Sequence, residues 1–176
     1  GIGGHYGDPD QPLILETDEA FNTFEKIKIS DLLVLNVDSD HLDYFKNLDN
    51  YKDAFYKVMK NVTDNLVINN DDLNIKSMKE LKNPVSYGKD IAADFKVQSP
   101  GTFLYENNKY EIKSEIIGDH FKSNMLGAVI LALLNGIEIE DSLNAIESFA
   151  GVKRRIELIG ISKGVLIYDD YGHHPT

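Results

Sequence analysis

Residues 32–45 read LLVLNVDSDHLDYF, an apolar run that gives way abruptly to polar side chains. A short apolar run bounded by polar residues is typical of a strand that is buried on both faces, as strands in parallel sheets are. Ligands of open α/β sheets bind just beyond the carboxyl ends of such strands. The pattern therefore predicts a strand over residues 32–37, and it puts Asp38, Asp40 and His41 where a functional site is expected.

A second stretch with the same pattern strengthens this interpretation. Residues 12–16 read PLILE, which predicts a short buried strand over residues 13–15 that ends in the carboxylate of Glu16. Two neighbouring strands ending in Glu16 and in the loop of His41 would direct a carboxylate and an imidazole into one crevice. Such a pair can hold a divalent cation, and phosphate oxygens would complete the shell of Mg²⁺. The alternative is that these polar residues form ordinary turns and that His41 is structural.

Composition limits the classes of protein to which the chain can belong. With 176 residues, 42% hydrophobic and 27% charged, it has the make-up of a globular protein with one domain, or one domain and a fragment. The formal net charge of −11 argues against a nucleic-acid partner. The absence of cysteine excludes a disulfide framework or a thiolate zinc site. No signal-peptide order opens the chain and no apolar run could cross a bilayer, so a cytoplasmic protein without membrane contact is expected.

Further strand and helix patterns predict an α/β fold, with a mostly parallel sheet flanked by helices. Residues 66–68 form a third buried-strand pattern, and apolar positions in residues 50–60 recur at helical spacing, which predicts a crossover helix between parallel strands. A short helix is expected over residues 73–81. Longer helices are expected from Gly118 to residue 135 and over residues 139–149, each followed by a glycine stop signal.

The strand pattern changes in the second half of the chain. Short alternating segments at residues 85–87, 95–97, 103–105 and 110–112 predict a small antiparallel meander attached to the parallel sheet, with a turn at residues 107–108. Two more strand-like segments follow at residues 156–161 and 165–168.

Five motifs carry a resemblance to the Mur ligases. They are ETDE at residues 16–19, NVDSDHLDY at 36–44, NNDD at 69–72, GVKRR at 151–155 and DDYGHHPT at 169–176. The chain is most similar to the branch of that family that joins L-alanine to UDP-N-acetylmuramate. The resemblance implies an ATP-dependent, amide-forming ligase of peptidoglycan precursor synthesis. Its substrates would be ATP, UDP-N-acetylmuramate and L-alanine, its cofactor Mg²⁺, and its intermediate an acyl phosphate.

The resemblance also implies roles for individual residues. Glu16 and His41 would hold Mg²⁺, Asn124 would face the nucleotide base, and Arg155 would contact the ATP phosphates and take part in catalysis. Asp170 and His173 would act from the C-terminal side, with Asp169 and His174 as alternatives at these two positions. The alternatives to these roles are helix capping for Asn124 and a solvated run of charges around Arg155.

Two features depart from the family pattern. Phe121 stands where the family's G-x-H-N-x-x-N motif has its first Asn, so either Asn124 serves alone or nucleotide affinity is lowered. No Walker A loop is present, because Gly88-Lys89 is followed by Asp90 and the glycines at residues 1–4 precede no Gly-Lys-Ser or Gly-Lys-Thr.

The expected domain organisation follows from the missing loop. Since the family's loop lies just upstream of the region that the first residues resemble, we expect residues 1–153 to be a middle, ATP-binding domain without its P-loop. Residues 154–176 would begin a C-terminal domain, and this stretch of chain alone is expected not to turn over ATP. Two other functions remain open: a murein peptide ligase, with a peptide as incoming amine, and a non-catalytic Mur-like nucleotide-binding module.

Overall fold

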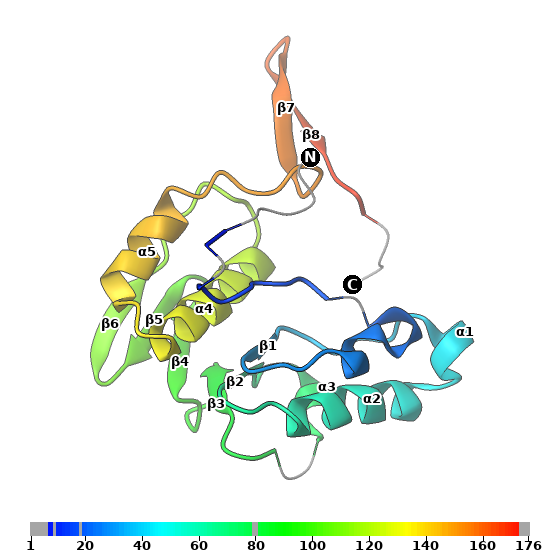
Figure 1. The fold of residues 1–176 in the computed structure, drawn as a ribbon. Coiled ribbons are helices and arrows are strands. Elements are labelled where there is room, and N and C mark those ends of the chain that lie inside the picture. The colour runs from blue at the N-terminus through cyan, green and yellow to red at the C-terminus, as the bar shows by residue number, and fades with distance from the viewer. Residues whose placement is uncertain (1–6, 9, 18, 79–80, 173–176) are drawn as a thin grey trace.

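The computed structural model describes residues 7, 8, 10–17, 19–78 and 81–172. Their elements, in chain order, are η1 (Ala20–Lys26), β1 (Leu32–Val34), α1 (Leu42–Phe45), α2 (Leu48–Lys60), β2 (Leu66–Asn69), α3 (Leu73–Lys76), β3 (Val85–Gly88), β4 (Phe95–Ser99), β5 (Thr102–Tyr105), β6 (Asn108–Glu111), α4 (Asp119–Leu134), α5 (Ile139–Glu147), β7 (Glu157–Ser162) and β8 (Val165–Asp169) (Figure 1). None of the helices in these residues is long and apolar enough to cross a membrane.

Six strands form one sheet in the order β1-β2-β3-β4-β5-β6. The first three neighbouring pairs are parallel and the last two, β4 with β5 and β5 with β6, are antiparallel. The predicted α/β class with a mostly parallel sheet is therefore confirmed. The predicted antiparallel meander is formed by β4, β5 and β6. The strand expected to open it, β3, instead pairs in parallel with both β2 and β4, so the meander begins one strand later than predicted. Tyr87 of β3 and Phe95 of β4 are 0% and 2% exposed and belong to the core.

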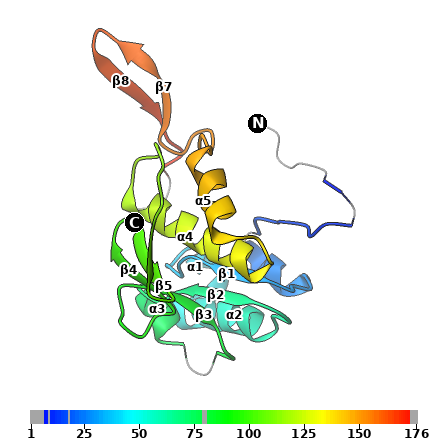
Figure 2. The same ribbon diagram turned by 90° about the vertical axis from the view of Figure 1, so that its left-hand side faces the viewer.

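Helices cover both faces of this sheet. In β2 the side chains of Leu66 and Ile68 join a core formed with α2, whereas Val67 joins a second core formed with α4. This division follows from the alternation of side chains along a strand. Figures 1 and 2 show α2 and α3 on one side of the sheet and α4 and α5 on the other. The apolar run of β2 is thus a strand buried between two layers of helices.

The strand predicted over residues 13–15 is not formed. Residues 12–17 have no regular secondary structure, and Leu13 and Ile14 are 83% and 94% exposed. An apolar run shows that a segment can be buried, but it does not specify a neighbouring strand with which to pair. Glu16 therefore does not lie at a strand end, which corrects that part of the prediction.

The strand predicted over residues 32–37 ends at Val34, and side chains from the end of β2 to the start of α3 hold its continuation. Asn69 Nδ2 donates to the Leu35 carbonyl at 3.1 Å. Asp72 Oδ2 accepts from the Val37 N–H at 3.2 Å, and Asn74 Nδ2 donates to the Val37 carbonyl at 2.6 Å. These bonds replace the backbone ladder beyond β1 and fix the path of the chain toward His41.

Asp72 is expected to stabilise the fold through two bonds at once, because its other oxygen accepts from the Ile75 N–H at 2.8 Å and caps α3. Asp72→Ala should lower the free energy of unfolding by about 2 kcal/mol, from one lost cap and one lost backbone partner. Urea denaturation measures this change. Asp53→Ala, at an exposed position of α2, is the matched control and should stay within about 0.5 kcal/mol of the parent.

Most remaining predictions agree with the structure. The helices expected over residues 50–60, 118–135 and 139–149 form as α2, α4 and α5, while the helix expected over 73–81 is formed only at Leu73–Lys76 in the described part. The β5–β6 hairpin forms, with its turn one residue earlier than predicted, since Glu106 and Asn107 have φ of 49° and 67°. β7 and β8 pair with each other as a separate two-stranded sheet that extends away from the main sheet (Figure 1).

Candidate functional site

The loop after β1 presents His41 in a fixed backbone conformation. His41 has φ 50°, in the left-handed region, and its carbonyl accepts from the N–H groups of Tyr44 and Phe45 at the start of α1. Its own N–H donates to Asp40 Oδ1 at 2.7 Å. Histidine is one of the few side chains enriched in the left-handed region. The sharp turn therefore projects the imidazole from a backbone that is held on both sides.

Two carboxylates lie beside this imidazole. His41 Nε2 is 4.0 Å from Glu19 Oε1 and 4.0 Å from Asp40 Oδ2. The three side chains are partly exposed, at 40% for His41, 24% for Glu19 and 42% for Asp40. A ligand can therefore reach them from solvent. We name Glu19, Asp40 and His41 the His41 cluster.

The donor set of the His41 cluster fits a divalent cation. One ligand atom from each of the three residues lies within 4.8 Å of the other two, so a single ion can be approached by all of them. Carboxylates with added water or phosphate oxygens suit Mg²⁺ and Mn²⁺, and imidazole is a common ligand of transition metals. The cluster also concentrates negative charge, which a bound cation would neutralise.

Tyr51 of α2 supports the cluster from the core side. Its hydroxyl donates to Glu19 Oε1 at 2.9 Å. Burial raises the pKa of Tyr51 far above its ordinary value, and the hydrogen bond to Glu19 and the negative charge of that carboxylate raise it further. Tyr51 is therefore a permanent donor at physiological pH. The sequence identified it only as an apolar residue on one face of a helix.

Glu16, the carboxylate predicted to pair with His41, has an exposed side chain in the irregular segment before η1. The structure instead brings Glu19 beside His41. Both glutamates belong to the same ETDE motif, so the motif itself was the signal for Glu19. What the sequence did not reveal is which of the two faces the imidazole.

A cavity lies at the start of α4. It has a volume of about 220 Å³ and is lined by polar and apolar residues from the end of β2, the residues after β3 and β6, the β4–β5 hairpin and the first turns of α4. Its polar residues include Asn69, Asp71, Lys89, Asp119, His120 and Lys122, and its apolar residues include Val97, Ile112 and Leu126. Asn124, predicted to face the nucleotide base, is half-buried one turn further along α4. Ser123, the residue before Asn124, is among the lining residues, so the cavity lies beside Asn124 in the chain.

Phe121 packs against His120 in the first turn of α4. Its ring lies 4.3 Å from the His120 ring, centroid to centroid, at an interplanar angle of 39°. The His120 ring also folds over Gly118, where an added Cβ would come within 2.7 Å of His120 Cε1. Gly118 has φ 123°, so a larger residue there would be both strained and obstructed. The aromatic pair thus takes the place that the family motif gives to His and Asn.

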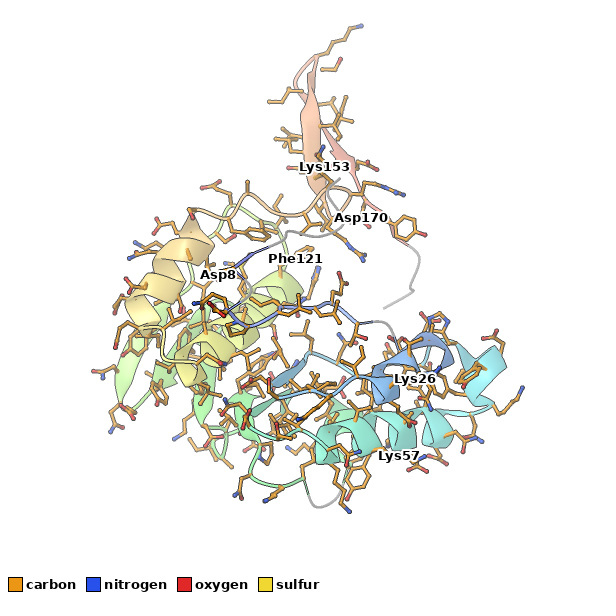
Figure 3. All side chains as sticks on the ribbon, in the orientation of Figure 1. Asp8, Lys26, Lys57, Phe121, Lys153 and Asp170 are labelled. Carbon is orange, nitrogen blue, oxygen red and sulfur yellow. The ribbon has the colours of Figure 1, made fainter. Side chains whose placement is uncertain are left out.

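The remaining predicted residues lie at the base of the β7–β8 hairpin or outside the described residues. Asp170 Oδ2 accepts from the Ile156 N–H at 2.8 Å, which ties the two ends of the hairpin together. Figure 3 labels Asp170 at the base of the hairpin. Arg155 is exposed. Asp169 is half-buried and pairs opposite Glu157. His173 and its alternative His174 fall outside the described residues.

A cation–π contact and a backbone hydrogen bond between Arg154 and Tyr171 also hold the base of the β7–β8 hairpin. The Arg154 guanidinium lies 4.5 Å from the centre of the Tyr171 ring, and the Tyr171 N–H donates to the Arg154 carbonyl at 2.7 Å. Arg155 and Asp170 are therefore presented from an ordered junction. The structure gives them no contact with the His41 cluster.

Comparison with known proteins identifies the family. The Mur ligase middle domain matches residues 18–132. The UDP-N-acetylmuramate–L-alanine ligase of Dictyoglomus turgidum is 35% identical over 93% of this chain, which covers 38% of that protein. The chain thus spans about two-fifths of the length of this curated relative.

Solved structures agree on the fold. The UDP-N-acetylmuramate-alanine ligase MurC of Thermotoga maritima is similar over 88% of this chain and 37% of its own, with 22% identity and a TM-score of 0.69. The MurF ligase of the same organism, solved in complex with ADP, is similar over 81% of this chain and 35% of its own, with 20% identity and a TM-score of 0.55. By the match of residues 18–132 and the identity to its relative, the chain belongs to the Mur ligase family.

Proposed function

We propose that this chain supplies the middle, ATP-binding domain of a cytoplasmic ligase that joins L-alanine to UDP-N-acetylmuramate in peptidoglycan precursor synthesis. The observation that carries the proposal is the 35% identity, over 93% of the chain, to a protein named as that ligase. The His41 cluster supports it, because it offers a cation site at the carboxyl end of β1, where ligands of α/β sheets bind.

The proposed domain boundary lies at residues 153–154. Residues 1–153 would form the middle domain and residues 154–176 the beginning of the C-terminal ligase domain. The separate sheet of β7 and β8 supports this division, since its pairing partners lie on its own side of the boundary. The family match over residues 18–132 falls wholly inside the first part.

The reaction that we propose has two steps. The γ-phosphoryl group of ATP passes to the muramate carboxylate, so that ADP leaves and an acyl phosphate forms. The amine of L-alanine then attacks the acyl carbon, loses a proton and expels inorganic phosphate. Phosphoryl transfer needs positioning and charge neutralisation more than covalent help from the protein.

Residues of this chain would serve both needs. His41, Glu19 and Asp40 would hold Mg²⁺, with Glu16 as a further oxygen donor. A bound Mg²⁺ neutralises charge on phosphate oxygens. Arg155 would add positive charge at the phosphates, and Asn124 would face the base beside the cavity at α4. Asp170 and His173 would act from the C-terminal side. The ADP complex of the structurally similar MurF ligase supports a nucleotide as ligand of this fold.

A chimaeric ligase tests the proposal. Residues 1–176 would replace the matching segment of the Dictyoglomus turgidum ligase, whose own residues supply the rest of the protein. We expect ADP release that requires UDP-N-acetylmuramate, L-alanine and Mg²⁺ together. The unmodified host ligase is the positive control. A chimaera that unfolds cooperatively and binds ADP yet releases none from ATP would favour the non-catalytic nucleotide-binding module instead.

A further inference from the structure

Tyr51 is anchored in the core by other aromatic rings. It is 3% exposed on α2. Its ring stands edge-on to Phe45, with centroids 5.0 Å apart and planes at 88°, and lies 5.1 Å from the ring of Phe55. Aromatic pairs of this geometry hold each other at defined angles. The position of the Tyr51 hydroxyl is therefore fixed by packing and does not depend on the bond that the hydroxyl makes.

The Tyr51 hydroxyl donates to the same Glu19 oxygen that lies nearest to the His41 imidazole. Tyr51 donates to Glu19 Oε1 at 2.9 Å, and the same Oε1 is 4.0 Å from His41 Nε2. A carboxylate oxygen has two lone pairs, so a bond from Tyr51 leaves one directed elsewhere. Glu19 itself stands just before η1, on a segment with no strand or helix on its N-terminal side among the described residues.

We propose that Tyr51 is a positioning residue, whose buried hydroxyl orients the Glu19 carboxylate toward His41 and so prepares the His41 cluster for a divalent cation. A free glutamate side chain samples several rotamers, and hydrogen bonds from outside the ligand shell select the one that binds the metal. This role rests on the proposed cation site. It adds a residue outside the quoted family motifs, at a position where the sequence alone indicated only core packing.

Mn²⁺ titration of the chain tests the role without any need for turnover. Free Mn²⁺ is measured by its electron paramagnetic resonance signal, which is lost on binding. Tyr51→Phe keeps the ring and removes the hydroxyl, and it should weaken Mn²⁺ binding by about tenfold, as loss of an outer-shell partner does. The matched control is Tyr56→Phe on the same helix, whose ring lies 5.9 Å from Lys60 Nζ; it should leave Mn²⁺ affinity unchanged.

The same substitution in a Glu19→Ala chain distinguishes a positioning role of Tyr51 from general damage to the fold. In a Glu19→Ala chain the hydroxyl has no carboxylate to orient, so adding Tyr51→Phe should leave the residual Mn²⁺ affinity unchanged. A merely structural effect of Tyr51→Phe would instead weaken binding by the same factor in both backgrounds. That result would overturn the proposal.

The remaining outcomes distinguish this inference from the cation site on which it rests. A parent chain that binds Mn²⁺ in a His41-dependent manner, with equal affinity in Tyr51→Phe, would overturn the role of Tyr51 and leave the site intact. A parent chain with no Mn²⁺ site, or one that His41→Asn does not affect, would overturn both.

Discussion

Replacement of His41 by Asn or Ala is expected to lower kcat/KM of the chimaeric ligase by about a thousandfold, which corresponds to about 4 kcal/mol of lost transition-state stabilisation. In the proposed site the imidazole would be the third ligand beside two carboxylates, and it lies 4.0 Å from an oxygen of each. Without it the cluster retains only like charges, which repel each other and hold a cation less well. The measurement is ADP release as a function of UDP-N-acetylmuramate concentration.

The two substitutions control for backbone strain. His41 has φ 50°, and Asn is tolerated in the left-handed region whereas Ala is disfavoured there. His41→Ala should therefore lose about 1 kcal/mol of stability that His41→Asn keeps, while both lose the same activity. Asp53→Ala on the exposed face of α2 should keep both activity and stability. Full activity in His41→Asn would refute the assignment of His41 to the site.

The sequence predicted those strands and helices that a continuous apolar pattern is sufficient to identify. The apolar runs in β1 and β2 and the apolar face of α2 are each continuous over a buried surface, so hydrophobic pattern was sufficient to find them. The run at residues 13–15 has the same composition but is exposed. Apolar composition indicates that a segment can be buried. Whether that segment pairs as a strand depends on residues far away in the sequence, which a local pattern does not include.

Polar motifs were predictable as clusters but not by role. The NNDD motif follows β2 as expected, yet Asp72 caps α3 and holds the Val37 N–H, and Asp71 Oδ1 accepts from the Lys89 N–H. Turn formation, the alternative weighed for the polar residues of the His41 loop, thus describes this motif well. For His41 the structure instead shows two carboxylates turned toward the imidazole. Side-chain direction distinguishes these cases, and residue identity does not determine it.

The sequence also did not determine which of Glu16 and Glu19 faces His41. Substitution of these two glutamates is the second change for which we expect a large effect. Glu16 precedes Glu19 by three residues, so their Cα atoms lie within about 11 Å of each other even in extended chain. Either carboxylate can reach one ion over such a distance, and Mg²⁺ takes an octahedral shell of oxygen ligands that three protein groups do not fill. We therefore expect both glutamates to act at one site, Glu19 before the nucleotide binds and Glu16 once the nucleotide is present.

In the chain without nucleotide, Glu19→Gln is expected to weaken Mn²⁺ binding by at least about a hundredfold, the upper end of what loss of an outer-shell partner alone costs. The amide keeps the shape of the side chain and the bond from Tyr51 but removes the charge beside His41. Glu16→Gln should change this affinity by less than about twofold, because the exposed Glu16 side chain lies outside the His41 cluster.

In the chimaeric ligase, where nucleotide and cation are present together, Glu16→Gln should lower kcat by about a hundredfold, as loss of one charge-stabilising group does. Mn²⁺ titration of the chain and ADP release by the chimaera measure the two effects on the same pair of variants. If Glu16→Gln weakens Mn²⁺ binding in the chain without nucleotide and Glu19→Gln does not, the pair predicted from the sequence, Glu16 with His41, is the cation site, and the 4.0 Å approach of Glu19 Oε1 to His41 Nε2 serves only the fold.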